Sequence, residues 1–158
     1  MENAKLDAID CKILEVLQQD GRISNVDLAT AVQLSAPQCF RRVRALEERG
    51  VVRGYRALVS PEALGLGVTA FVSLSIESSA FGRVREIEAL LREIPELLEL
   101  HMMSGDADYL LKLVARDLKQ LGSLLTDRLM QIEGVADVRS MVCLEELKPP
   151  SGLPIHGV

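Results

Sequence analysis

Arginine is concentrated in one short stretch of this 158-residue chain. Between Ser35 and Arg56 there are six arginines and two glutamates, although the net charge of the whole chain is −5 at pH 7. A guanidinium group can bind guanine through two hydrogen bonds, and it can also neutralise a phosphate. A local basic surface on an acidic body fits contact with a phosphate backbone better than attraction by the molecule as a whole.

A second stretch with distinctive chemistry reads SGDADYLLK, from Ser104 to Lys112. Two carboxylates, Asp106 and Asp108, flank a turn between two apolar runs. Gly and Asp are common turn formers, so one interpretation is an acidic hairpin turn. The other interpretation is a small-ligand site, in which main-chain groups and Ser104 hold a ligand carboxylate while Asp106 or Asp108 meets its ammonium group. A free amino acid carries that pair of charges.

Other kinds of site have little support in the sequence. The three cysteines are far apart and include no C-x-x-C pair, which argues against a zinc site and a disulfide framework. The two histidines, His101 and His156, have no nucleophile–base arrangement around them. The N-terminus has no signal-peptide pattern, and no apolar run approaches the ~20 residues needed to cross a bilayer. We expect a cytoplasmic protein with no catalytic residues, no metal, no cofactor and no membrane partner.

Two helices are predicted before the basic stretch. Apolar residues recur at helical spacing over residues 6–19, and the Asp-Gly pair that follows ends this first helix. The Ser24-x-x-Asp27 sequence places a side-chain cap before a second, short helix that begins near Asn25.

The arginines themselves fall on a third predicted helix, from about Ala36 to Arg49. Ser35 and Gln38 form a capping box at its start. One side of this helix is apolar and holds Cys39, Val43 and Leu46, with Phe40 flanking them. The opposite side is polar and holds Gln38, Arg41 and Arg44, with Arg42 between the two sides. The apolar side can pack on the first two helices, which leaves the cationic side exposed.

A short helix, a tight turn and a second helix with exposed arginines are typical of a helix-turn-helix, whose second helix fits the major groove. The following VVRGYRALV, residues 51–59, predicts a two-stranded ribbon that turns at Arg53-Gly54 and forms a wing. The sequence therefore predicts a winged helix-turn-helix that binds double-stranded DNA. The candidate DNA-contact residues are Ser24, Ser35, Gln38, Arg41, Arg42, Arg44, Arg53 and Arg56.

The second half has a different pattern. Residues 61–67 are rich in Pro and Gly and are predicted to be a hinge. Strand and helix periodicities then follow in the order strand, helix, strand, strand, helix, strand, which predicts a ferredoxin-like domain over 68–147. We therefore expect an α+β protein with a winged helix-turn-helix at 1–60 and a flexible tail at 148–158. The helices of such a domain cover one sheet face, so a second subunit is expected to cover the other and form a homodimer.

Taken together, LDAIDCKILEVLQQDGRISNVDLA, then LS-x-x-x-C-x-x-RVR-x-LEE-x-GV-x-x-GY, then SGDADYLLK, resemble the Lrp/AsnC, or feast/famine, family of transcriptional regulators. The SGDADYLLK segment is nearer the leucine-responsive branch. The resemblance implies regulation of amino-acid metabolism genes and a dimer that assembles further, commonly to an octamer. It also implies that a free amino acid, leucine or another small one, binds between ligand-binding domains. The effector-site residues implied in this way are Ser104, Gly105, Asp106, Asp108 and Tyr109.

Two alternatives belong to other functional classes. The same two-domain plan resembles that of siroheme decarboxylases, which use histidines, but His156 lies in a Pro/Gly-rich tail and His101 fits a strand at a subunit contact. A stand-alone amino-acid sensor that regulates an enzyme would explain the second half of the chain, but it would leave the basic helix without a role.

Overall fold

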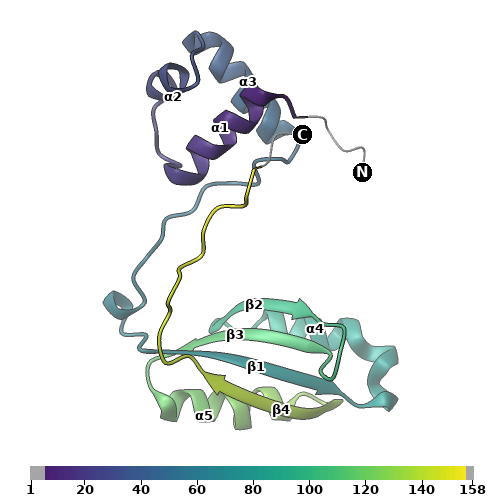
Figure 1. Ribbon diagram of the computed structural model, residues 1–158. Coiled ribbons are helices and arrows are strands. Elements are labelled where there is room, and N and C mark those ends of the chain that lie inside the picture. Colours follow the sequence, from purple (N-terminus) through teal and green to yellow (C-terminus); the bar gives the residue numbers. More distant parts are fainter. Residues whose placement is uncertain (1–5, 156–158) are drawn as a thin grey trace. The chain divides into compact units, whose positions relative to one another are not determined.

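The structure, a computed structural model, describes residues 6–155, which divide into two compact units (Figure 1). The first unit contains the chain up to Leu58 together with the residues from Lys148 onward, and the second contains Val59–Leu147. These boundaries differ from the expected ones, because the C-terminal segment belongs to the first unit. His156 and the end of the predicted tail lie outside the described residues.

The first unit contains the three predicted helices: α1 (Ala8–Gln19), α2 (Asn25–Ala31) and α3 (Ala36–Glu48). Each begins where a side chain accepts hydrogen bonds from free backbone N–H groups or exchanges them with the first turn. Asp7 caps α1 by accepting from the N–H groups of Ile9 and Asp10, at 2.9 and 2.8 Å. The Oγ of Ser24 accepts from the N–H of Asp27 at the start of α2, at 3.1 Å.

The core of the first unit joins the apolar sides of the three helices. Cys39 and Leu46 of α3 are fully buried, as their positions on the helix predict, and Val43 packs beside them. The remaining buried members are Ile13, Leu28, Ala29 and Val32. This packing fixes which side of α3 is left for solvent.

The predicted ribbon over residues 51–59 is absent: this segment contains no strand. It is held against the helices instead. The N–H groups of Val51 and Val52 donate to the Leu46 carbonyl at 2.9 and 3.1 Å, and the Tyr55 hydroxyl donates to a carboxylate oxygen of Glu47 at 2.9 Å. These contacts hold the first half of the segment on α3, and they would be lost if the segment formed a two-stranded ribbon.

The second unit is a four-stranded antiparallel sheet with the strand order β2-β3-β1-β4. Its elements, in chain order, are β1 (Val68–Ile76), α4 (Val84–Arg92), β2 (Leu97–Met102), β3 (Tyr109–Ala115), α5 (Leu118–Asp127) and β4 (Val135–Val142). This order confirms the ferredoxin-like prediction. The last strand ends at Val142, earlier than expected. Short 3-10 helices at Glu62–Leu64, Ser78–Arg83 and Leu129–Gln131 complete the secondary structure of the described residues.

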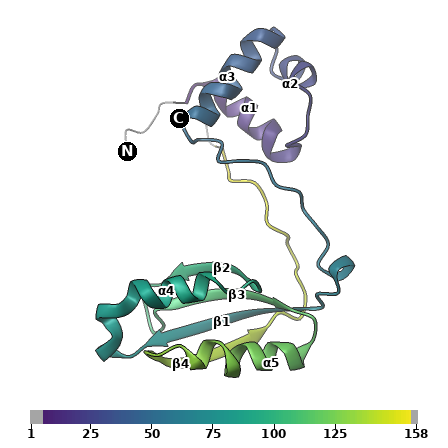
Figure 2. The same ribbon diagram turned by 180° about the vertical axis from the view of Figure 1, so that it is seen from behind.

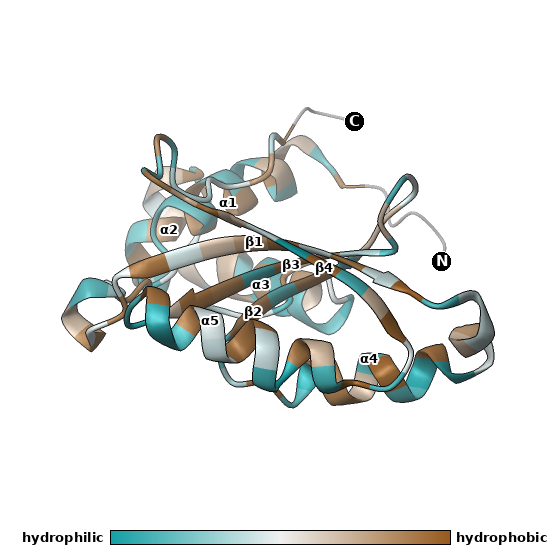
Figure 3. Ribbon diagram, turned by 90° about the horizontal axis from the view of Figure 1, so that it is seen from below, coloured by the Kyte–Doolittle hydropathy of each residue, from teal (hydrophilic) through white to brown (hydrophobic). Residues whose placement is uncertain are grey.

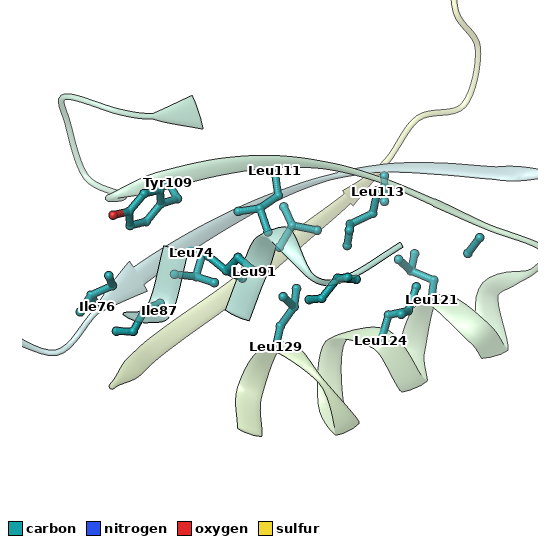
Figure 4. Close-up of a cluster of buried hydrophobic side chains, with 14 of the residues drawn as sticks. Leu74, Ile76, Ile87, Leu91, Tyr109, Leu111, Leu113, Leu121, Leu124 and Leu129 are labelled. Atoms are coloured by element: carbon teal, nitrogen blue, oxygen red, sulfur yellow. The ribbon is translucent and has the colours of Figure 1, made fainter. Parts of the chain in front are cut away.

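Helices α4 and α5 lie on the same face of this sheet (Figure 2). Apolar and polar positions alternate along both helices (Figure 3). Along β1, Ala70, Val72, Leu74 and Ile76 are buried while the residues between them are partly exposed, which is the alternation expected of a half-covered strand. Figure 4 shows the side chains of Leu74 and Ile76 in one apolar cluster with side chains of α4, α5 and β3.

The C-terminal segment is not free where it is described. The side-chain amide of Gln18 donates to the Leu153 carbonyl at 3.0 Å and accepts from the Leu153 N–H at 2.5 Å. This reciprocal pair attaches the segment to the last turn of α1, in contrast to the flexible tail expected from its Pro/Gly content. No helix among residues 6–155 is long and apolar enough to span a bilayer.

Candidate nucleic-acid interface and ligand-binding turn

The exposed side of α3 is formed by residues that recur every three or four positions. Gln38, Arg41 and Arg44 are all exposed, and neither arginine forms a salt bridge within residues 6–155. Phe40 is also 55% exposed, although its place beside the apolar side of the helix suggested a position at the edge of the core. The helix therefore presents two free guanidinium groups and one aromatic ring to solvent.

Arg42, also expected to contact DNA, forms ion pairs within the first unit. One of its guanidinium nitrogens lies 2.7 Å from a carboxylate oxygen of Asp7 and 2.7 Å from one of Asp10, both at the start of α1. Asp10 is buried, and Arg42 is the cation that compensates its charge. Hydrogen bonds from the Asp10 N–H and from Arg42 lower the pKa of Asp7, while Asp7 and Asp10 raise the pKa of Arg42. Arg42 thus joins α3 to α1.

The polar residues at the helix starts are partly used by the fold. The Ser24 hydroxyl donates to Asp27 at 2.6 Å, and the Oε1 of Gln38 accepts from the Ser35 hydroxyl at 2.8 Å. The side-chain NH2 group of Gln38 donates no hydrogen bond within residues 6–155, so it is available to another acceptor. Sequence reasoning missed Asn25, whose side-chain amide donates to the Ala36 carbonyl at 2.9 Å and ties the start of α2 to the start of α3.

Arg53 and Arg56 are exposed on the extended segment that follows α3. Tyr55 lies between them, and its bond to Glu47 fixes the segment on α3. Burial, followed by the neighbouring Glu47, raises the pKa of Tyr55 to about 12. An open groove beside α3 is lined by Phe40, Val43, Arg44, Glu47 and Tyr55, among other residues. The two arginines are therefore carried by an anchored segment, even though it is not a ribbon.

In the second unit, residues 103–108 form the turn between β2 and β3, and Tyr109 is the first residue of β3. Asp108 is engaged there: its carboxylate accepts from the Ile76 N–H at 2.7 Å, and its own N–H donates to the Leu74 carbonyl at 3.1 Å. These bonds attach the turn to the end of β1. Asp108 is therefore a poor candidate for a ligand's ammonium group.

Tyr109 points into the core and is 3% exposed. Its hydroxyl donates to Glu88 of α4 at 3.0 Å, and the other carboxylate oxygen of Glu88 accepts from Arg85 and Arg92, both at 3.1 Å. Burial and then Glu88 raise the pKa of Tyr109, while Arg92 and then Tyr109 lower the pKa of Glu88. Sequence reasoning missed Glu88, because a glutamate on a polar-looking helix gives no sign of being buried.

The rest of the turn is exposed. Ser104, Gly105 and Asp106 are all on the surface, and Gly105 has a φ of 150°, which a side chain would disfavour. Asp106 forms no hydrogen bond or salt bridge within the part of the chain that the structure describes. The structure thus divides the five implied effector residues into an exposed group and an anchoring pair. Within the same part of the chain, no cluster of three His, Cys, Asp or Glu residues could hold a metal ion.

A helix-turn-helix unit with exposed arginines, joined to a ferredoxin-like unit with an exposed polar turn, defines a two-domain DNA-binding regulator. Comparison with known proteins agrees for both units. Residues 6–53 match the family described as winged helix-turn-helix DNA-binding, and residues 69–153 match the Lrp/AsnC ligand binding domain. The chain belongs to the Lrp/AsnC family.

The relatives are similar over nearly the whole chain. A leucine-responsive regulatory protein of Rhizobium meliloti is 43% identical over 144 residues, covering 91% of this chain and 92% of the relative. The Escherichia coli K12 protein of that name is 40% identical over 150 residues, covering 95% and 92%.

Solved structures show the same arrangement of elements. A transcriptional regulator from Neisseria meningitidis, solved in complex with L-methionine, has a TM-score of 0.91 and 40% identity, covering 95% of this chain and 97% of that one. Escherichia coli AsnC, at 23% identity and a TM-score of 0.84, shares the fold. The expected proximity to the leucine-responsive branch is confirmed by these identities.

The chain is accordingly a DNA-binding transcriptional regulator that responds to an amino acid, and it is not an enzyme. The decarboxylase alternative is not favoured, since the family and its matched relatives are regulators. The described histidine, His101, is exposed on β2 and lies 3.1 Å from Glu99, as expected of a surface strand residue.

Proposed function

We propose that this regulator, acting in the cytoplasm, binds double-stranded DNA with α3 in the major groove. Gln38, Arg41 and Arg44 would meet base edges and phosphates, because they form the free polar side of the helix. Ser24 and Ser35, at the starts of α2 and α3, would meet phosphates, as would Arg53 and Arg56 on the following segment. The observation that carries this proposal is the exposure of Arg41 and Arg44, which form no salt bridge within residues 6–155, on a helix whose other side is buried.

A mobility-shift titration over a range of salt concentrations tests this part. Phosphate contacts release counterions, so the logarithm of the binding constant should fall linearly with the logarithm of the salt concentration. Arg53→Ala and Arg56→Ala should each reduce that slope by about 1. Slopes that match the wild type would remove these two residues from the interface.

We further propose that the effector amino acid binds at the exposed end of the turn. Ser104 and the backbone of Gly105 would hold its carboxylate, and Asp106 would meet its ammonium group. Asp108 and Tyr109 would support the turn from within. The support comes from their different surroundings: Asp106 is exposed and unpaired in residues 6–155, whereas Asp108 and Tyr109 are bonded to β1 and α4. The relative solved with L-methionine makes that amino acid and L-leucine the first ligands to test.

Isothermal titration with L-leucine and L-methionine tests the ligand proposal. Leucinamide lacks the carboxylate and N-acetyl-leucine lacks the ammonium group, so both should bind at least tenfold more weakly than the parent amino acid if both charges are recognised. Equal affinity for leucine and N-acetyl-leucine would rule out the pairing with Asp106.

Finally, we propose a homodimer that assembles further, up to an octamer. The sheet face opposite α4 and α5 carries Phe71, Leu110 and Met141. Phe71 pairs with Met141 of β4, and Leu110 of β3 pairs with Ser73, which lies on the same face of β1 as Phe71. A second copy of the chain would cover these three apolar side chains. Light scattering after size-exclusion chromatography should give an even multiple of 17.3 kDa, and Phe71→Asp should shift the protein toward monomer. A monomeric wild type would contradict the proposal.

A further inference from the structure

Phe40 is the apolar member of the exposed side of α3. Its ring is 55% exposed, whereas the neighbouring Cys39 and the next core residue, Leu46, are 0% and 1% exposed. Aromatic residues make up only 3% of this chain, and Phe40 is the aromatic residue of α3. The residue contributes less to the core than its type suggests.

The spacing of Phe40 places it among the residues positioned to reach bases. Pro37, Phe40, Arg41 and Arg44 are all exposed and follow the pattern i, i+3, i+4 and i+7. The recognition helix of a homeodomain reads the major groove with residues at this spacing, and helix-turn-helix proteins contact bases with the first turns of the second helix. Phe40 is the fifth residue of α3, within its first two turns.

The ring has a cation beside it and borders an open groove. The guanidinium carbon of Arg44 lies 5.8 Å from the ring centroid, a cation–π distance. The ring also borders the groove formed with Val43, Glu47 and Tyr55. An anionic duplex drawn in by Arg41 and Arg44 would therefore meet the ring beside those arginines.

We infer that Phe40 is a specificity-determining residue whose ring packs against the 5-methyl group of a thymine in the major groove. This inference rests on the proposed insertion of α3 into that groove. The major-groove edges of the base pairs present hydrogen-bond donors and acceptors, and the thymine methyl is their apolar feature. A phenyl ring placed there gains from contact with the methyl, while the other edges offer polar groups that it cannot satisfy.

The test compares thymine with uracil, which differs only by that methyl group. A duplex is selected from a random-sequence library by the full-length wild-type protein, and a second duplex is made with deoxyuridine replacing the thymines. Removal of one buried methyl per half-site should weaken wild-type binding by about 3- to 10-fold. Phe40→Ala should bind both duplexes with equal affinity. Phe40→Leu keeps an apolar side chain, so it serves as a control for misfolding, and it should retain part of the difference in affinity between the two duplexes.

Val26→Ala is the matched control, because Val26 is also apolar, 64% exposed and on another helix of the same unit. It should preserve the full wild-type difference between the two duplexes. Equal wild-type affinity for thymine and uracil duplexes would overturn the inference, as would a full difference retained in Phe40→Ala. Neither result would contradict the proposed DNA binding if the affinity of the wild type for the duplex still depends on salt concentration. A wild type that binds no duplex would overturn the proposed function and this inference with it.

Discussion

Arg41 and Arg42 are neighbours on α3 with different partners. Arg41 is exposed and free within residues 6–155, while Arg42 bridges two carboxylates of α1. Substitution of Arg41 should therefore affect DNA affinity, whereas substitution of Arg42 should affect the free energy of unfolding.

Arg41→Ala should weaken binding to a selected duplex by about 1–3 kcal/mol if it contacts a base, with little change in the free energy of unfolding. Arg42→Ala leaves Asp10 buried without its cation, and it should lower the free energy of unfolding of the first unit by about 1–3 kcal/mol. Mobility shifts and urea unfolding measure the two effects. An Arg42 variant of unchanged stability that loses DNA affinity would restore Arg42 to the interface.

The carboxylate of Asp7 makes the stability of the same unit depend on pH. Its pKa is below the ordinary value of 3.8 in the folded protein, so its contribution is complete above that value and is lost as the pH falls through the lower, folded pKa. Asp7→Asn keeps a good helix cap but removes the charge. The variant should be less stable than the wild type at about pH 6, and the difference should shrink toward about pH 3. Glu15→Gln, at an exposed position on α1, is the control, and a pH-independent difference would contradict this account.

Substitutions of Asp106 and Asp108, two residues apart in the turn, should also have different effects. Asp108→Ala leaves the Ile76 N–H without its acceptor, so the second unit should lose about 1–3 kcal/mol of unfolding free energy. Asp106→Ala should leave stability within about 0.5 kcal/mol but weaken L-leucine or L-methionine binding. Urea unfolding and isothermal titration of both variants measure this, and an Asp108 variant of wild-type stability would show that its bond to β1 is not needed.

At the scale of elements, the approach of the 3-10 helix Ser78–Arg83 and α4 to the start of β4 depends on Gly134. Gly134 has a φ of +96°, and a Cβ there would lie 2.6 Å from the Cβ of Ala80 and 3.2 Å from the Cδ1 of Ile87. Gly65, in the same unit, has a φ of +71° with no atom within 4 Å of such a Cβ. The two glycines share the backbone requirement but differ in the space around them.

Gly65→Ala should cost about 1 kcal/mol of unfolding free energy, from backbone strain alone. Gly134→Ala should cost about 2–4 kcal/mol, because overpacking is added to the strain. Urea unfolding of the second unit compares them directly. Equal costs would mean that α4 can shift to accept the extra methyl group.

The elements themselves follow closely from local sequence. The caps at Ser24 and Ser35 begin α2 and α3 where expected, and the alternation along β1 predicts its buried face. Short-range hydrogen bonds and periodic burial decide these features, so they can be predicted without knowledge of the fold. The segment 51–59 could not be predicted in this way, because Val51, Val52 and Tyr55 bond to α3 instead of pairing as strands.

At the scale of the whole molecule, the chain leaves the first unit after Leu58 and returns to it from Lys148. Gln18 receives the returning segment through two hydrogen bonds to Leu153. The second unit is thus joined to the first by chain at both of its ends.

Gln18→Ala should lower the free energy of unfolding of the first unit by about 0.5–1.5 kcal/mol and accelerate amide exchange at Leu153. A chain shortened to end at Leu147 should lose at least as much stability, while the second unit should be unaffected. Gln19→Ala, at the exposed neighbouring position, is the control. Unchanged exchange at Leu153 in Gln18→Ala would show that other contacts hold the segment.

The order of elements, the two cores and the cationic side of α3 can be predicted from the amino-acid sequence, because periodicity and capping act between residues a few positions apart. The family follows from the resemblance of the sequence motifs. The roles of Arg42, Asp108, Tyr109 and Glu88 could not, since their partners are 21 to 35 positions away. The attachment of Leu153 to Gln18 spans 135 positions. Hydrogen bonds over such separations depend on packing that only the folded chain creates, and packing decides which charged side chains are exposed to DNA or ligand and which hold the fold together.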